Sequence, residues 1–163
     1  MKVSIYIKAH FRGNPRGAGE AAAVVEFIDK LENSHKRQQK VEIKQDTKNA
    51  LYLKICNAAM RLLLKPCNIT IFIDCDYMAN ACRLGWLEKW QQDGWKKATG
   101  KPPVNVKEWK QFYMLTQIHT VTFKKYNDRH DAELEEVLGG QHEIHGIESQ
   151  DCKIHSADYS TKD

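Results

Sequence analysis

The chain has 163 residues, of which 42% are hydrophobic and 28% charged, and 25 Lys and Arg against 21 Asp and Glu give a formal net charge of +4. This length predicts one domain with a sizeable core, and the composition excludes wholesale disorder and fibrous proteins. The small positive excess permits a polyanionic partner without requiring one.

The first third of the chain has the pattern of three β-strands. Alternating apolar residues predict a strand over 3–7, and the loop "RGNPRGAG" over 12–19 separates it from a second strand, "AAAVVEFID", over 21–29. The polar segment "LENSHKRQQK" over 31–40 is typical of a turn, whereas "KVEIKQ" over 40–45 alternates again. Short connections between these strands predict an antiparallel meander.

The most regular helical pattern follows. Asp46 or Thr47 can cap a helix that runs up to Lys65-Pro66. Its apolar positions recur at helical spacing: Leu51, Ile55, Ala58, Leu62 and Leu63. The β-branched run "NITIFID" over 68–74 then predicts a strand buried on both faces.

The remaining elements are predicted from spacing and from Gly and Pro positions. Helices are expected over 77–93 and 106–117, with the loop "KKATGKPPVN" between them. A strand, "IHTVTFKK", over 118–125 precedes a short helix over 129–138, which ends at Gly139 and Gly140.

The resulting order is β-β-β-α-β-α-α-β-α. A meander followed by β-α-β units predicts an α/β fold with a mixed five-stranded sheet, antiparallel and then parallel, flanked by helices. We expect one domain over 1–138 and a mobile polar tail over 139–163.

Cysteine usage and hydropathy bear on the compartment. The five cysteines are odd in number and form no C-x-x-C pair, which favours reduced thiols over a disulfide framework or a zinc site. No apolar run approaches the roughly 20 residues of a membrane span, and the N-terminus lacks the pattern of a secretory signal. We therefore expect a cytoplasmic protein with no membrane partner.

A longer motif then points to a known family. In "WLEKWQQDGWKKATGKPPVNVKEWKQF" over 86–112, two tryptophans four apart precede a G-W-K step, a basic loop and a helix opening with N-V-x-x-W. Shorter matches are "IYIKAHFRGNPRGAG" over 5–19, "TKNALYL" over 47–53, "IFIDCDYM" over 71–78 and "NDRHDAEL" over 127–134. Over residues 3–138 the chain resembles ribonuclease H of type 1.

The resemblance implies an active site at the strand ends. Active members of the family hold two Mg²⁺ ions there with four carboxylates and hydrolyse a phosphodiester. The corresponding positions here are Lys8, Tyr52, Asp74 and Asp131. An ammonium cannot ligate a metal, and a tyrosine with a pKa of about 10 is neutral at pH 7. We therefore expect no metal cofactor, and a salt bridge from Lys8 to Asp74 or Asp131.

An alternative keeps the enzyme active. A divergent endonuclease could cleave RNA in RNA/DNA hybrids with Mg²⁺ or Mn²⁺ on Asp74 and Asp131, helped by displaced carboxylates. The candidates are Asp76, Asp128 and Glu133, although Asp76 is expected to cap a helix and the others to be solvated. The family's histidine loop does not fit into "KKYNDRHD", so His130 has no expected acid–base role.

The favoured function is binding without hydrolysis. The resemblance implies that the G-N-P loop, the first helix and the Trp-rich region grip the backbone of an RNA/DNA hybrid or duplex. The matching residues are Asn14, Thr47, Asn49, Trp86, Trp90, Trp95, Lys96, Lys97 and Lys101. The competing interpretation is that the tryptophans pack in the core. A third class of function is a protein-interaction scaffold with a protein partner.

Overall fold

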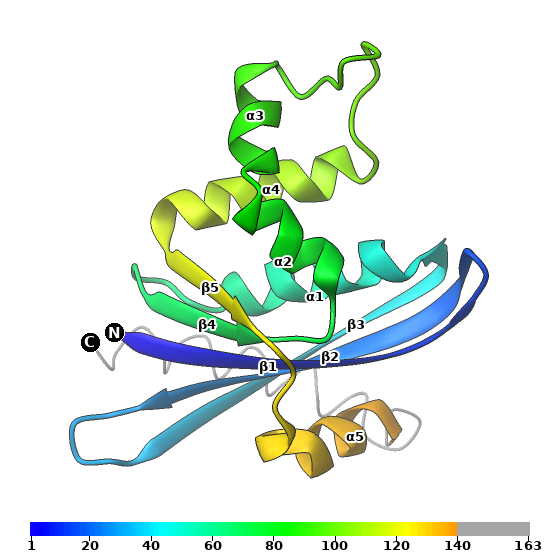
Figure 1. Cartoon of the computed structure of the whole chain (residues 1–163). Coiled ribbons are helices and arrows are strands. Elements are labelled where there is room, and N and C mark those ends of the chain that lie inside the picture. The colour runs from blue at the N-terminus through cyan, green and yellow to red at the C-terminus, as the bar shows by residue number, and fades with distance from the viewer. Residues whose placement is uncertain (140–163) are drawn as a thin grey trace.

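The computed structural model describes residues 1–139, which form one five-stranded mixed sheet with helices on both faces (Figure 1). The strands are β1 (Lys2–Gly13), β2 (Arg16–Ile28), β3 (Ser34–Thr47), β4 (Asn68–Phe72) and β5 (Thr120–Lys124). Their spatial order is β3-β2-β1-β4-β5. The first three are antiparallel and the last two run parallel to β1, which confirms the predicted α/β class and sheet.

The meander is longer than predicted. Most of the expected loop over 12–19 is strand, because Gly13 pairs with Gly17 around a turn at Asn14 and Pro15. A Cβ on Gly17 would lie 2.1 Å from the Arg12 carbonyl oxygen, so the glycine allows close approach here instead of ending the strand. The segment 34–40, expected to be a turn, belongs to the edge strand β3, where its polar side chains other than the buried Arg37 keep some exposure to solvent.

The helices are α1 (Lys48–Met60), α2 (Asp76–Arg83), α3 (Trp86–Gln92), α4 (Val106–Ile118) and α5 (Asp131–Gly139), with a 3₁₀ turn over Asp128–His130. Thr47 caps α1 as predicted, since its Oγ1 accepts a hydrogen bond from the Ala50 N–H at 3.1 Å. The helix predicted over 77–93 is wrong as a single element: Gly85, with φ of 73°, separates α2 from α3. Asp76 is the first residue of α2, and not its cap.

Two cores lie on opposite faces of the sheet. Ile5 and Ile7 of β1 face the larger core, which α1 and α4 cover, whereas Tyr6 faces a smaller core closed by α5 (Figure 1). This alternation explains why Tyr6 interrupts the apolar pattern in the sequence. In β4, Ile69 and Ile71 are buried but Thr70 is only half-buried, so burial on both faces was overestimated.

The cysteines, the tail and the predicted compartment remain to be compared with the structure. The four described cysteines are free, as expected. Cys152 and the tail beyond Gly139 lie outside the described residues. Among the helices of residues 1–139, none has both the length and the apolar character needed to cross a membrane. The cytoplasmic compartment stays a prediction.

Candidate functional site

Lys8 of the central strand β1 is held by two carboxylates of α5. Its Nζ lies 2.7 Å from Oδ1 of Asp131 and 2.7 Å from Oε2 of Glu135. Since Asp131 and Glu135 are one turn apart, they share the helix face that covers Tyr6 and Lys8. The predicted salt bridge to Asp131 is confirmed, and Glu135 is an additional partner.

Two further side chains complete this group, which we call the Lys8 cluster: Lys8, His10, Tyr126, Asp131 and Glu135. The His10 ring lies 3.1 Å from Glu135 through its Nε2, and the Tyr126 hydroxyl donates to Oδ1 of Asp131. Sequence reasoning missed these partners. The signals were present in the i,i+4 spacing of the two acids and in the position of His10 two residues after Lys8 on the same strand face.

The charges of the Lys8 cluster stabilise one another. Hydrogen bonds to Asp131 and Glu135 raise the pKa of Lys8 well above its usual range. The Lys8 hydrogen bond, followed by that of Tyr126, lowers the pKa of Asp131. Lys8 likewise lowers the pKa of Glu135. The cluster therefore holds one cation between two anions at neutral pH.

Tyr52 and Asp74 are the other two positions that the resemblance assigns to metal ligands. Tyr52 is a buried residue of α1, and burial, with smaller effects from Cys75 and Asp74, raises its pKa to about 12. Asp74 is exposed just beyond β4. The paired register of β1 and β4 ends at Tyr6 and Phe72, two residues before Lys8 and Asp74. Within residues 1–139, however, the ion pairs of Lys8 go to α5, and none joins it to Asp74.

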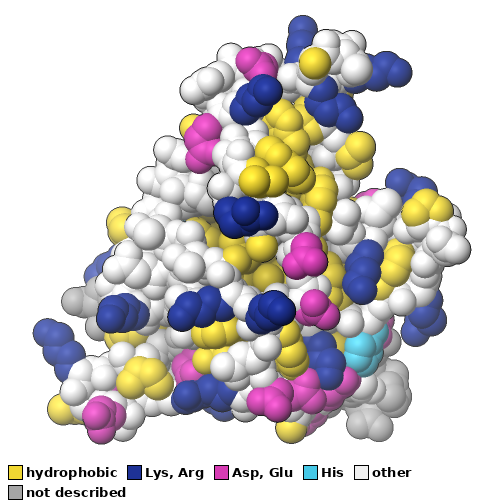
Figure 2. Space-filling view, viewed as in Figure 1, with side chains coloured by type: hydrophobic (Ala, Val, Ile, Leu, Met, Phe, Trp, Pro, Cys, Tyr) yellow, Lys and Arg dark blue, Asp and Glu magenta, His cyan; other side chains and the backbone are white. Residues whose placement is uncertain are grey.

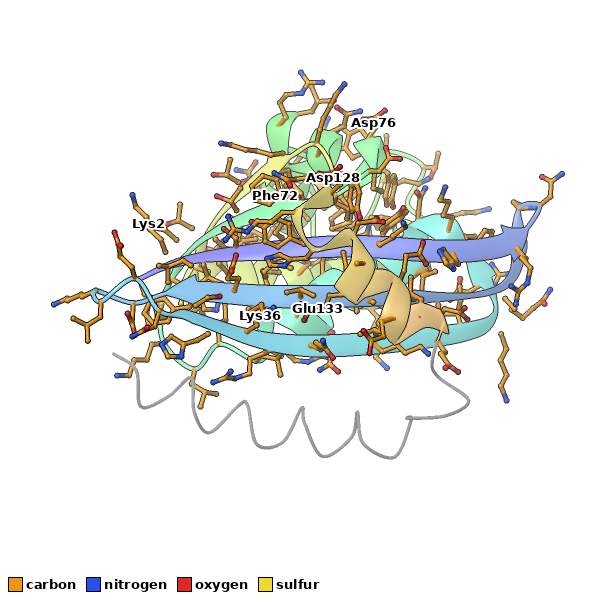
Figure 3. The ribbon with its side chains drawn as sticks, turned by 90° about the horizontal axis from the view of Figure 1, so that it is seen from below. Lys2, Lys36, Phe72, Asp76, Asp128 and Glu133 are labelled. Carbon is orange, nitrogen blue, oxygen red and sulfur yellow. The ribbon has the colours of Figure 1, made fainter. Side chains whose placement is uncertain are left out.

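The carboxylates considered as replacement metal ligands, Asp76, Asp128 and Glu133, lie outside the Lys8 cluster. Glu133 accepts hydrogen bonds from Lys36 at 2.8 Å and Gln38 at 2.7 Å, and Figure 3 shows Glu133 beside Lys36 and away from Asp76. Asp76 and Asp128 are exposed. His130 lies 3.1 Å from the buried Glu26 through its Nε2, which gives it a structural contact.

The tryptophans of the motif pack mainly on one another. Trp109 is fully buried and its Nε1 donates to the Tyr77 hydroxyl at 2.8 Å. The ring centroids of Trp86 and Trp90 are 6.0 Å apart, and those of Trp90 and Trp95 are 6.4 Å apart. The core-packing interpretation is therefore confirmed for Trp109, while the other three rings are half-buried at the edge of the core.

A hollow beside these rings carries positive charge. It has a volume of about 580 Å³, and its lining includes Trp86 and Trp90, the three cations Lys89, Lys96 and Lys97, and one acid, Asp93. The Lys97 N–H donates to the Lys101 carbonyl oxygen at 2.7 Å, which closes the loop that carries these cations. Figure 2 shows Lys and Arg side chains gathered at the end of the molecule where α3 and this loop lie.

The remaining binding candidates lie near the start of α1. Asn14 is exposed at the β1–β2 turn, and Asn49 is exposed in the first turn of α1. The pairing of Arg16 with Thr47 brings this turn next to α1. Thr47 itself uses its hydroxyl oxygen in the helix cap.

Comparison with known proteins identifies the family of the chain. The family profile described as RNase H matches residues 1–133. The chain belongs to the ribonuclease H family. A ribonuclease H of Lachnoclostridium phytofermentans is 34% identical over 76% of this chain and 78% of its own length.

Solved ribonuclease H structures share the fold. LC9-RNase H1, described as a type 1 RNase H with the type 2 active-site motif, superposes with a TM-score of 0.69 at 20% identity, over 86% of this chain and 73% of its own. A foamy viral protease-reverse transcriptase in complex with dsDNA gives a TM-score of 0.62 at 15% identity, over 86% and 91%.

The side chains at this ribonuclease H site do not fit the two metal ions of the family. Mg²⁺ takes oxygen ligands at short range, whereas Lys8 places a positively charged nitrogen 2.7 Å from carboxylate oxygens of Asp131 and Glu135. Tyr52 is neutral at pH 7, and burial raises its pKa further, to about 12. In the part of the chain that the structure describes, no group of three or more His, Cys, Asp or Glu side chains is placed to hold a metal ion.

Proposed function

We propose that this ribonuclease H family member binds nucleic-acid duplexes, including RNA/DNA hybrids, without hydrolysing them. The observation that carries the proposal is the Lys8 ammonium between Asp131 and Glu135. It stands at one of the four positions that the resemblance assigns to metal-binding carboxylates, where its positive charge repels a divalent ion. The cluster thereby replaces metal-dependent stabilisation of the site with an internal ion pair.

The basic hollow supports the binding half of the proposal. Lys96, Lys97 and Lys101 are exposed on one short loop, where they can contact successive phosphates. Trp86 and Trp90 form an apolar wall of the same hollow. The exposed turn at Asn14 adds a second group that can contact the backbone. Phosphate contacts of this kind carry little sequence information, so we expect binding that depends on duplex shape and salt.

The second candidate is an active, divergent ribonuclease H. Two observations favour it: curated relatives carry that name, and Asp74 is exposed at the strand end, where a metal could approach. In that case Asp74 and Asp131 would be the carboxylates that hold Mg²⁺ or Mn²⁺. Such a site would require Lys8 to leave Asp131 first, which breaks the contacts that raise its pKa.

One assay separates these functions. The purified chain is incubated with a labelled RNA/DNA hybrid in Mg²⁺ and in Mn²⁺, and product is resolved on a gel. We expect uncleaved hybrid together with binding at low salt that weakens as salt rises. Cleavage that disappears in Asp74→Asn would establish the enzyme and overturn the proposal.

The binding half has its own control. Charge reversal in the loop, Lys97→Glu with Lys101→Glu, should weaken hybrid affinity by at least about tenfold at low salt. Lys30→Glu, an exposed lysine in the β2–β3 turn, is the matched control and should change affinity little. Absence of binding to hybrid, duplex DNA and single strands at low salt would favour the protein-interaction scaffold instead.

A further inference from the structure

Helix α4 has an apolar face in addition to the one it buries. Trp109 and Phe112 are fully buried in the larger core. Met114 and Ile118 are four residues apart and therefore share another face of the helix, where they are 66% and 54% exposed. A helix that packs against the core needs one apolar stripe, with polar residues opposite. The second face is therefore not explained by the fold.

This face forms one wall of a groove between α4 and the end of α1. The groove has a volume of about 590 Å³. Its lining includes four apolar side chains and three cations: Val106, Met114, Leu115 and Ile118, with Arg61, Lys107 and Lys110. No acidic side chain is among the described residues that line it. An apolar strip beside a row of cations fits a partner surface that has apolar side chains next to acidic ones.

We propose that this groove docks an amphipathic helix with an acidic face, supplied by a partner protein. The apolar side of such a helix would cover Met114 and Ile118, while its carboxylates would pair with Arg61, Lys107 and Lys110. Exposed apolar side chains beside charges of one sign are typical of interaction sites. Electrostatic complementarity predicts that the partner is negatively charged where it faces the groove, because all three charged side chains of the groove are positive.

Two other occupants fit the same observations less well. A nucleic acid would use the cations, but the apolar strip offers Met, Leu and Ile where base stacking requires aromatic rings. A second copy of this chain in a symmetric dimer would bring its own three cations to the same contact, so like charges would face each other. The acidic helix satisfies the apolar strip and the cations together.

The site is independent of the proposed nucleic-acid function. The α4 groove lies on the face of the sheet opposite to α5, which carries two carboxylates of the Lys8 cluster (Figure 1). None of the residues lining it belongs to that cluster or to the basic loop over 96–101. An experiment can therefore disprove peptide binding in the α4 groove without disproving nucleic-acid binding, and the reverse.

The test uses the full chain and a designed peptide. The probe is a fluorescein-labelled helix about five turns long, with Leu on one face and Glu on the other. A scrambled peptide of the same composition and a peptide with Lys in place of Glu are the reference probes. Fluorescence anisotropy should give an affinity for the acidic amphipathic peptide at least about tenfold above both references.

Two pairs of variants locate the peptide. Ile118→Asp should weaken its binding by about tenfold or more, whereas Leu84→Asp, which is also 54% exposed but lies outside the groove, should not. Lys107→Glu with Lys110→Glu should also weaken binding by about tenfold or more, whereas Lys30→Glu with Lys44→Glu, two exposed lysines outside the groove, should not. Circular dichroism and thermal unfolding establish that each variant is folded.

Each other result would overturn the proposal. Equal binding of the scrambled peptide would show that recognition does not depend on an amphipathic helix. Unchanged affinity in both groove variants would place the peptide elsewhere. Concentration-dependent dimers that Ile118→Asp dissolves would identify a second copy as the occupant. Loss of hybrid binding in Lys107→Glu with Lys110→Glu, with no peptide binding by the unmodified chain, would assign the groove to nucleic acid.

Discussion

The Nζ of Lys8 lies 2.7 Å from Oδ1 of Asp131, and this contact joins the central strand of the sheet to the last described helix. In an active ribonuclease H these two positions are expected to share metal ions. Here they neutralise each other directly. The consequence is that removing the cation should affect folding, and that restoring a carboxylate should restore the need for a metal.

The first prediction concerns Lys8→Met, which keeps the length of the side chain and removes its charge. Without Lys8, Asp131 and Glu135 repel each other and their lowered pKa values return toward the ordinary 3.8 and 4.5. A lowered carboxyl pKa contributes stability above the unfolded-state pKa, and this contribution is lost as pH falls through the folded-state pKa. The variant should therefore be less stable than the unmodified chain near about pH 6, and the difference should shrink below about pH 4.

Urea unfolding across this pH range measures the effect. Lys2→Met is the control, because Lys2 is an exposed lysine of the same strand. A Lys8→Met variant that is as stable as the unmodified chain at neutral pH would mean that the Lys8 cluster contributes no net free energy.

The second prediction concerns the contact between α2 and α4. In Tyr77→Phe the buried Trp109 N–H loses its acceptor, which lies at 2.8 Å, while the ring contact remains. A buried donor without a partner costs about 1–3 kcal/mol. Urea unfolding should show a loss in this range, and Tyr113→Phe, which keeps the ring against Trp95, should lose less. Equal losses in the two variants would contradict a specific role for the Trp109 hydrogen bond.

The third prediction separates capping from binding at Thr47. In Thr47→Ala the Ala50 N–H at the start of α1 loses the side-chain oxygen that it contacts at 3.1 Å, which should reduce the free energy of unfolding by about 1 kcal/mol. Thr47→Ser keeps the cap and should retain most of the stability. If Thr47 serves mainly as a cap, Thr47→Ser should also leave hybrid affinity unchanged. A clear loss of affinity in Thr47→Ser would indicate a direct contact with nucleic acid.

The sequence predicted the fold where local periodicity agrees with tertiary packing. Alternation predicted β1 and helical spacing predicted α1, with Thr47 as one of two predicted caps, although α1 ends at Met60 and not at Lys65-Pro66. The predictions failed at glycines and at the sheet edge. Gly17 permits close strand pairing where the sequence suggested a loop, and Gly85 divides a helix that apolar spacing had joined.

Only part of the site was predicted, because contacts between residues far apart in the sequence depend on the fold. Lys8 and Asp131 were identified from the resemblance, but their separation of 123 residues means that only the fold brings them together. Glu135 and His10 match no motif of the family; they join the site because Glu135 shares a face of α5 with Asp131 and His10 shares a face of β1 with Lys8. The α4 groove was missed although all of its lining residues except Arg61 lie on α4, because helical spacing alone does not tell which apolar side chains of the helix stay exposed.

The fourth prediction restores carboxylates with Lys8→Asp and Tyr52→Glu together. The new side chains would stand near Asp74 and Asp131, and the change would remove the cation that pairs with Asp131. The two new acids would add to Asp74, Asp131 and Glu135, and these carboxylates would repel one another, while the buried position of Tyr52 would add a desolvation cost. The double variant should therefore be less stable than the unmodified chain without divalent ions. It should recover stability with Mg²⁺ or Mn²⁺, because oxygen ligands bind these ions in the folded state only.

Thermal unfolding with and without metal measures this exchange. At a metal concentration about 100 times the dissociation constant, binding to the folded state stabilises by about 2.7 kcal/mol, whereas the unmodified chain should show no comparable shift. Lys8→Met with Tyr52→Phe is the matched control, since it removes the same groups without adding carboxylates. A metal-dependent shift as large in the unmodified chain as in the double variant would show that Lys8 does not prevent metal binding, and would favour the active enzyme. Hybrid cleavage by the double variant alone would show that the loss of carboxylates at positions 8 and 52 is sufficient to explain a loss of hydrolysis.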